Sequence, residues 1–337
     1  MRNPNFNNLV KVLQCGVPDR PTLFELFLND PLYIRLAGPK IAAQKDKLYE
    51  FRLKVHAFRN AGYDYATVYG SDFKFPVGET HMKKTVSLNE GGIISDRGSF
   101  DKYKWPDPEE SDYSNLEGIK DEMPEGMKLV IMGPGGVLEN VINLVGYDNL
   151  CYMIYEDPEL AGDVFGAVGT RLISYYEICS RFDTVGALVS NDDWGFNTQT
   201  MLSPNDLRKY VFPWHKRIVE VIHSAGKLAI LHSCGKLDCV MEDVIEDMKF
   251  DGKHSFEDNI LPVEEAYEKW GGRIGILGGI DLDFVCRASH EEIKARSLKM
   301  LKRTENRGGY ALGTGNSVPD YVPDDSFFAM TSAVLQV

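Results

Sequence analysis

The sequence predicts an α/β protein, a single (β/α)8 TIM barrel with an N-terminal helical extension. Short apolar, β-branched runs bounded by Gly, Asp or Pro recur eight times, as expected of strands buried under helices. Amphipathic helical stretches lie between the later runs. The chain has 337 residues, more than the roughly 250 of a typical barrel. No GxGxxG or Walker loop supports an open nucleotide-binding sheet.

We predict a helical extension over residues 1–60 and the barrel over 61–337. In the extension, apolar-periodic stretches at Pro21–Phe27 and Ile41–Phe58 predict two helices.

The barrel elements follow in chain order. The predicted strands are Tyr65–Tyr69, Gly92–Ser95, Lys128–Met132, Gly186–Ser190, Leu228–Leu231, Gly252–Ser255, Ile274–Leu277 and Tyr310–Leu312. The predicted helices between the later strands are Pro204–Ser224, Leu237–Met248, Val263–Trp270 and His290–Thr304. Since the loops after barrel strands carry the functional side chains, we expect the site there.

The composition argues against nucleic acid and anionic membranes as partners. The formal net charge of -13 repels nucleic acid and anionic membranes. The six cysteines have no disulfide-scaffold spacing, which favours a reducing compartment. No apolar run reaches the ~20 residues of a spanning helix, so we predict a cytoplasmic protein. For its assembly we keep a homodimer as the candidate.

One strand ends in a pair of metal-ligand residue types. Leu228–Leu231 runs directly into His232, Ser233 and Cys234. An imidazole and a thiolate two residues apart bind Zn²⁺ well. The alternative is a buried cysteine and a hydrogen-bonding histidine that merely close the strand.

A second strand runs into Asn191, Asp192, Asp193 and Trp194, with Asn197 shortly after. Adjacent acids at a strand end suit acid/base chemistry, so we predict Asp193 as a catalytic residue. Asn191, Trp194 and Asn197 are predicted to contact the substrate. The alternative is a turn with solvated carboxylates.

Two further loops supply candidates. The Gly-flanked loop after the last strand carries Thr314 and Asn316, predicted to bind substrate, because such loops let backbone approach a ligand closely. After the first strand, Tyr69 and Asp72 are catalytic candidates and Glu79 a metal candidate. Plain turns are the alternative for each of these loops.

Together these landmarks resemble the uroporphyrinogen decarboxylase superfamily. The motifs that carry the resemblance are Leu202-Ser203-Pro204, the helix with Tyr210 and Pro213, His232-x-Cys234-Gly235, Gly278-Gly279-Ile280-Asp281 and Gly313-x-Gly315-Asn316 with Pro319 and Pro323. The resemblance implies a TIM barrel and covers most of the chain, most strongly from Gly186 onward.

The resemblance is nearer the corrinoid-dependent methyltransferase branch, such as methylcobalamin:coenzyme M methyltransferase. It implies zinc bound by His232, Cys234 and a cysteine of the last loop, where this chain has Thr314. A carboxylate such as Glu79 or Asp193, or a water, would complete the site.

The decarboxylase branch implies an arginine-rich N-terminal segment that binds substrate carboxylates. Residues 22–30 of this chain contain no arginine, although Asp72 matches the family's pyrrole-binding Asp. An octa-acid tetrapyrrole needs such cationic partners, so decarboxylation is less favoured.

We therefore predict a corrinoid-linked methyltransferase, with zinc as Lewis acid on a small methyl donor or thiol. The corrinoid (cobalamin) would arrive on a partner protein, because no Asp-x-His-x-x-Gly segment is present. The first alternative is a decarboxylase of a porphyrinogen or related substrate, using Asp72 with Tyr155 or Asp193. The second is a non-catalytic protein that binds a corrinoid or tetrapyrrole.

Overall fold

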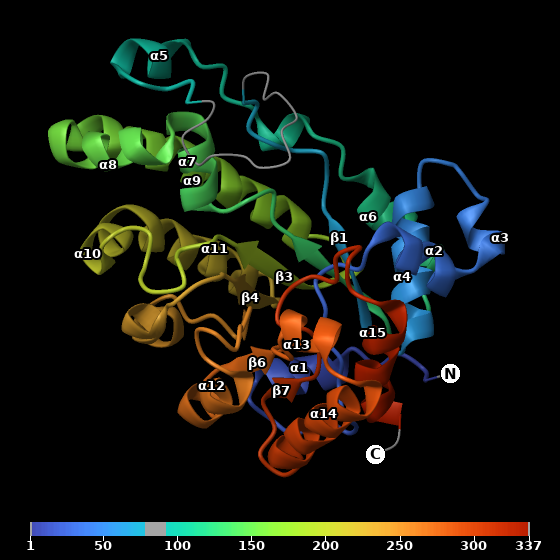
Figure 1. Cartoon of the computed structure of the whole chain (residues 1–337). Helices are drawn as coiled ribbons and strands as arrows, with labels where there is room; N and C mark the ends of the chain where they lie inside the picture. Colours follow the sequence, from blue (N-terminus) through green and yellow to red (C-terminus); the bar gives the residue numbers. More distant parts are fainter. Residues whose placement is uncertain (1, 78–91, 336–337) are drawn as a thin grey trace.

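A computed structural model of the protein describes residues 2–77 and 92–335. Its centre is a sheet of seven parallel strands that pair in chain order (Figure 1). The strands are β1 (Tyr65–Tyr69), β2 (Lys128–Met132), β3 (Val185–Asn191), β4 (Leu228–His232), β5 (Gly252–His254), β6 (Gly275–Leu277) and β7 (Tyr310–Ala311). Seven of the eight predicted strands are confirmed to within a few residues, and the curved parallel sheet is that of a TIM-like α/β fold. A closed eight-stranded sheet is not observed among the described residues.

The predicted strand Gly92–Ser95 is wrong. β1 pairs directly with β2, which leaves no place for another strand between them. The amides of Ile93 and Ile94 both donate to the carbonyl of Leu144, at the end of a helix. A short apolar run is ambiguous by itself, and here its backbone partners belong to a helix terminus rather than to a strand.

The predicted helix at Pro21–Phe27 is also wrong, because this segment lies extended between β7 and β1. Leu23 and Leu28 form parallel bridges to Leu312 and Val318. On the other side, the hydroxyl of Tyr65 in β1 bonds to the backbone N–H and C=O of Glu25, each at 2.7 Å. The segment is apolar because it is buried beside the sheet, where successive side chains on both faces are covered.

The strand register gathers polar side chains at the carboxyl ends. Asn191 in β3 pairs with His232 in β4, and His232 pairs with His254 in β5. Side chains at paired positions of parallel strands lie on the same face of the sheet. The three side chains are buried and adjacent, which builds one polar row at the rim of the sheet.

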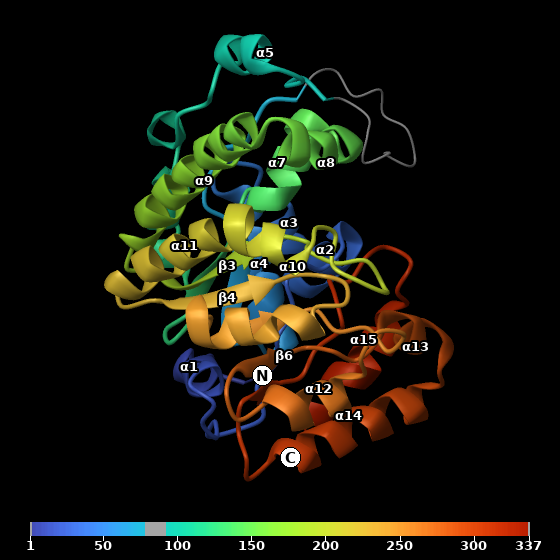
Figure 2. The same cartoon turned by 90° about the vertical axis from the view of Figure 1, so that its left-hand side faces the viewer.

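Among the helices that follow β2, α9, α11 and α12 pack on the strands, and α9 and α11 lie along β3 and β4 (Figure 2). The helices after β2 are α7 (Val137–Val145), α8 (Tyr147–Glu156), α9 (Pro158–Ser180), α10 (Pro204–Asp206), α11 (Phe212–Ser224), α12 (Val263–Trp270), α13 (Leu282–Arg287), α14 (His290–Thr304) and α15 (Asp324–Thr331). The segment between β1 and β2 carries the short helices α5 (Arg97–Lys102) and α6 (Ser114–Gly118). Among the residues described, no helix combines the length and the apolar character needed to cross a membrane.

Two predicted helices are less regular than expected. A π-helical turn, Leu207–Val211, interrupts the predicted helix Pro204–Ser224. It lies just before Pro213, which has no N–H to donate to the carbonyl of Lys209. The predicted helix Leu237–Met248 consists of a 3-10 turn and a π turn. α12 and α14 form as predicted.

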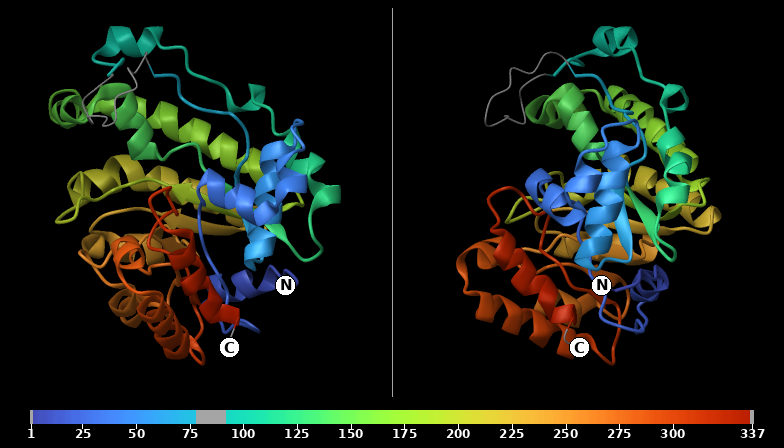
Figure 3. Two further views of the ribbon diagram at one scale, coloured as in Figure 1. Left: turned by 45° about the vertical axis from the view of Figure 1, so that its right-hand side comes forward. Right: turned by 90° about the vertical axis from the view of Figure 1, so that its right-hand side faces the viewer.

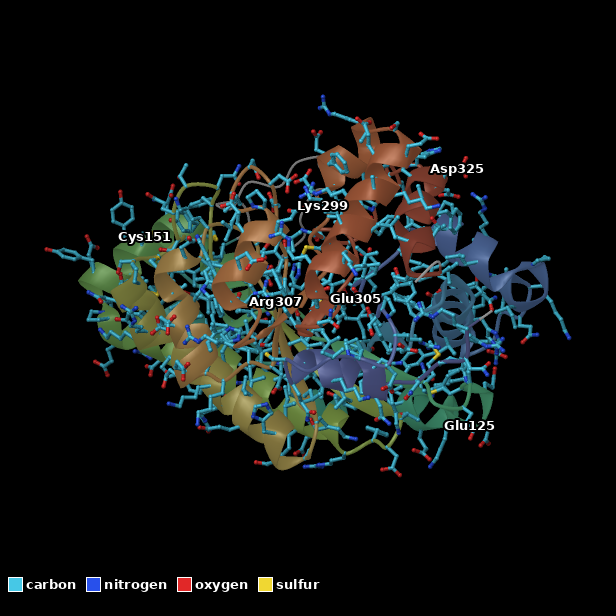
Figure 4. All side chains as sticks on the ribbon, turned by 90° about the horizontal axis from the view of Figure 1, so that it is seen from below. Glu125, Cys151, Lys299, Glu305, Arg307 and Asp325 are labelled. Atoms are coloured by element: carbon cyan, nitrogen blue, oxygen red, sulfur yellow. The ribbon has the colours of Figure 1, made fainter. Side chains whose placement is uncertain are left out.

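The N-terminal residues form α1 (Asn7–Leu13), α2 (Asp30–Ala37), α3 (Pro39–Ala42) and α4 (Tyr49–Ala61). α1 packs against β6 and β7 from below the sheet (Figure 4). α2 and α4 pack together, next to the C-terminal α15 (Figure 3). An ion pair of 2.6 Å between Arg35 and Asp324 joins α2 to α15. The N-terminal helices and α15 are thus joined directly.

Candidate metal centre at the carboxyl ends of the strands

Asp193, His232 and Cys234 converge at the rim of β3 and β4. One ligand atom from each residue lies within 4.8 Å of the other two. His232 Nε2 is 3.8 Å from Cys234 Sγ and 4.0 Å from Asp193 Oδ1. The loops after two neighbouring strands therefore supply an imidazole, a thiol and a carboxylate to one point.

The backbone after β4 holds this geometry. Gly235 has a φ of +88°, and a Cβ there would lie 2.1 Å from the carbonyl oxygen of Gly195. Only glycine allows this close approach of the two loops. Because they touch, the N–H of Cys234 donates to Asp193 Oδ1 at 2.8 Å. The glycine of the His-x-Cys-Gly motif thus brings the carboxylate to the thiol.

A second histidine orients the first. His232 Nδ1 lies 2.9 Å from His254 Nδ1, so the two nitrogens share one proton. Burial lowers the pKa of His232 to about 4 and that of His254 well below its usual range. Both rings are neutral near pH 7. When His232 donates from Nδ1, its Nε2 lone pair faces Cys234 and Asp193, as a metal ligand requires.

The donor set of Asp193, His232 and Cys234 fits a zinc ion. Burial, followed by the nearby Asp193 carboxylate, raises the pKa of the Cys234 thiol to about 12. A bound divalent cation would lower the pKa of the thiol again, because it stabilises both the thiolate and the carboxylate. Three protein ligands drawn from Cys, His and Asp, with a further position open, are typical of catalytic zinc sites.

The adjacent residue Asp192 has a different role from Asp193. Its carboxylate is fully buried and accepts the N–H groups of Leu138 and Glu139 at the start of α7, each at 2.9 Å. His215 Nε2 lies 2.8 Å from the same carboxylate, and His215 Nδ1 lies 2.9 Å from Ser190 Oγ. Asp192 therefore joins β3, α7 and α11 and does not reach the centre.

Replacing Asp192 by alanine is expected to lower the free energy of unfolding by about 3 kcal/mol, because two amides and His215 lose a buried partner. Urea unfolding measures the change. Asp193→Ala is the matched control: its side chain is 40% exposed, and we expect a loss below about 1 kcal/mol. Equal losses in the two variants would contradict the structural role of Asp192.

Three predicted substrate-binding residues lie beside the centre. Asn316 donates its side-chain N–H to Cys234 Sγ at 3.3 Å. Thr314 is fully buried and contacts Glu25. The Asn191 amide lies 3.3 Å from Glu139.

Two others lie away from it. The ring of Trp194 is fully buried against Phe212 and His215, with ring centroids 5.0 Å from each. It packs in the core, because the chain turns after Asp193 and directs the next side chain beneath α11. Asn197 is exposed in the turn that follows. The core position of Trp194 leaves its ring out of the centre, and the substrate contact of Asn197 stays a prediction.

The candidates after β1 supply no atom to the three-residue metal cluster, although burial, followed by the nearby Glu139 carboxylate, raises the pKa of Tyr69. Tyr69 is 47% exposed and stacks on Phe27 at 5.2 Å, and Asp72 is exposed. Tyr155, considered for the decarboxylase, is 89% exposed on α8. Glu79 lies outside the described residues.

Glu139, which was not among the residues predicted from the sequence, lies close to Asp193. Burial, together with Asp192 and Asp193, raises the pKa of Glu139 to about 8. The N–H of Gly136 donates to its carboxylate at 2.8 Å. A glutamate three residues after a Gly-rich strand end is the pattern of a helix capping box, and this pattern could have drawn attention to it.

Glu25, also absent from the predicted residues, is completely buried. Burial raises its pKa to about 8. Its signal in the sequence is a single acidic residue within an apolar run, Leu23 to Leu28.

A groove of about 960 Å³ adjoins the centre. Asn316 lines this groove and also bonds to Cys234, so the groove and the metal cluster lie on either side of Asn316. Its walls include the rings of Phe256 and Phe284 and several carboxylates, among them Glu257.

A parallel strand–helix sheet with its polar cluster at the carboxyl ends of the strands defines the class of TIM-barrel-type enzymes. Within that class, the model of the uroporphyrinogen decarboxylase (URO-D) family matches residues 52–337. The chain belongs to this family, as its motifs predicted.

Among solved structures, a methyltransferase from Methanosarcina mazei is similar over 99% of both chains, with 14% sequence identity and a TM-score of 0.71. At this identity the similarity shows a shared fold. Xylanase B from Clostridium stercorarium F9 matches 72% of this chain and 88% of its own, with 12% identity and a TM-score of 0.41, which is too low to carry an argument. No curated protein matches the sequence.

Proposed function

We propose that the protein is a corrinoid-linked methyltransferase whose zinc ion is held by Asp193, His232 and Cys234. The observation that carries the proposal is the convergence of these three ligand atoms within 4.8 Å. The similarity in fold to a methyltransferase over 99% of the chain supports it.

In this proposal each side chain of the centre has a separate role in holding the zinc ion. His232 supplies a neutral nitrogen, oriented by His254. Asp193 takes the place of the further ligand, since Thr314 stands where the resemblance implies a cysteine. Zinc in this position would act as a Lewis acid on a thiol, or on the heteroatom from which the methyl group departs.

The reaction breaks one methyl–heteroatom bond and forms one methyl–cobalt bond, or the reverse. The reduced corrinoid supplies the electron pair for the new bond, and the heteroatom leaves with the pair of the old one. Glu139, a buried carboxyl group on the Asp193 side of the centre, would exchange a proton with the leaving heteroatom. The corrinoid would be carried by a partner protein that approaches the rim of the sheet.

The family match also favours a second candidate, a decarboxylase of a porphyrinogen or related substrate. Its substrate would carry several carboxylates. The groove beside the centre is lined by five carboxylates and one cation, Arg287. Arg296 and Arg287 pair with Asp258 and Asp283, and the remaining carboxylates, Glu257, Asp281 and Glu292, repel such a substrate. We therefore place methyl transfer first.

Zinc-loaded protein mixed with reduced free cobalamin and a methyl donor tests the proposal. Donors from three classes are compared: methyl thioethers, methyl ethers and methylamines. We expect at least one class to give methylcobalamin, seen in the visible spectrum, with zinc-free protein as the control. If no donor or acceptor reacts in either direction, and a porphyrinogen instead loses carbon dioxide, the decarboxylase is correct.

A further inference from the structure

The buried carboxyl group of Glu25 contacts one residue of the loop after β7 at both of its oxygens. Glu25 Oε1 accepts the N–H of Thr314 at 2.7 Å. Glu25 Oε2 lies 2.7 Å from Thr314 Oγ1. The same hydroxyl also contacts the backbone carbonyl of Asn316. The Thr314 hydroxyl therefore lies between two oxygen atoms.

The number of protons available to these contacts fixes the protonation state of Glu25. A hydroxyl group has one proton, and a carbonyl oxygen can only accept. The Thr314 proton is therefore donated to the carbonyl of Asn316. The contact between Thr314 Oγ1 and Glu25 needs a second proton, and only the Glu25 carboxyl group can supply it. Glu25 is then a neutral acid that donates through one oxygen and accepts through the other.

The surroundings of Glu25 agree with this assignment. It has no ion pair within residues 2–77 and 92–335, and an isolated buried carboxylate is strongly disfavoured. Burial raises its pKa to about 8. The other titratable groups that face it are the tyrosines Tyr33, Tyr63, Tyr65 and Tyr310, which bring no positive charge.

The loop held by Glu25 reaches the sulfur of the metal centre. Asn316 Nδ2 donates to Cys234 Sγ at 3.3 Å. Asn316 Oδ1 accepts the N–H of Ser317 at 2.8 Å. The second bond orients the amide, because its oxygen must face the Ser317 N–H and its nitrogen then faces the sulfur.

We infer that Glu25 is a positioning residue of the metal centre: as a neutral acid it holds the loop Gly313–Ser317 so that Asn316 donates an N–H to the sulfur of Cys234. The inference rests on the proposed metal site. A hydrogen bond to a thiolate withdraws electron density from sulfur and so tunes its bond to a metal. The loop after β7 thus contributes a donor to the sulfur.

The test uses Co²⁺ as the probe, because a cobalt–thiolate bond gives a charge-transfer absorption band that reports the electron density on sulfur. In Asn316→Ala the band is expected to move to lower energy, and Co²⁺ affinity to fall about tenfold. Glu25→Ala is expected to shift the band in the same direction. Glu25→Gln is expected to keep the wild-type band, since a glutamine amide donates to Thr314 Oγ1 and accepts from Thr314 N–H as the neutral acid does.

Asn259→Ala is the matched control. Asn259 is an exposed asparagine that lines the same groove, and its loss should leave the band in place. A band that does not move in Asn316→Ala overturns the inference. So does a Glu25→Gln variant that shifts as far as Glu25→Ala, because the charged form would then be the required one.

Infrared spectroscopy of the metal-free protein at pH 6 measures the proton directly. A carboxylic acid C=O band that disappears in Glu25→Gln supports the neutral state, and its absence in the wild type overturns it. This measurement needs no Glu25→Ala variant, which removes a buried contact and risks misfolding. If the wild-type protein gives no cobalt–thiolate band, the proposed metal site and function are wrong. If the wild-type protein gives the band and Asn316→Ala does not shift it, only the role of Glu25 and Asn316 is wrong.

Discussion

Replacing Cys234 by alanine is expected to reduce zinc from near-stoichiometric to trace amounts after washing with a chelator, and to lower methyl transfer by at least about 100-fold. Cys234 is the sulfur ligand of the cluster, and two hydrogen-bonded neighbours already face it at 3.3 and 3.8 Å. The remaining imidazole and carboxylate hold a divalent ion weakly in water. Elemental analysis and the cobalamin assay measure the two losses.

Cys239→Ala is the control for this experiment. Cys239 is an exposed cysteine five residues further along the chain, and its loss should change neither zinc content nor turnover. His232→Ala should behave like Cys234→Ala. Retained zinc and retained activity in Cys234→Ala would rule out the proposed centre, and retained activity with lost zinc would rule out zinc as the Lewis acid.

The stability of the protein is expected to fall by about 4 kcal/mol as pH rises from 4.5 to 8, through Glu25 alone. Burial raises the pKa of Glu25 from 4.5 to about 8 in the folded chain. The folded state therefore binds a proton that the unfolded state releases. The resulting stability is fully present below pH 4.5 and is lost as pH rises toward and through 8.

Urea unfolding of wild type and Glu25→Gln over this pH range measures the effect. The glutamine variant cannot ionise, so the difference between it and wild type isolates Glu25 from every other titrating group. At pH 8 the variant is expected to be the more stable protein by several kcal/mol, with similar stability near pH 4.5. The same exchange at exposed Glu109 controls for the loss of one carboxylate. Parallel curves for wild type and Glu25→Gln would contradict the buried neutral acid.

Most of the fold and part of the candidate metal centre could be predicted from the sequence. Short apolar, β-branched runs bounded by Gly, Asp or Pro located seven strands, since burial under helices leaves a local signature in residue type. His232 and Cys234 were identifiable because both ligands lie within three residues of each other at a strand end. The two wrong elements, Pro21–Phe27 and Gly92–Ser95, are short apolar segments whose backbone partners are distant in the chain.

What the sequence by itself determined are the features that depend on neighbours along the chain: the strand–helix alternation, the family, and the His-x-Cys pair. The tertiary structure alone decided which carboxylate joins that pair, since Asp192 and Asp193 differ only in which loops and helices surround them. It also decided the partnership of His232 with His254 and of Glu25 with Thr314. Such contacts join residues 22 to 289 positions apart, and only the register of the parallel strands brings them within hydrogen-bonding distance.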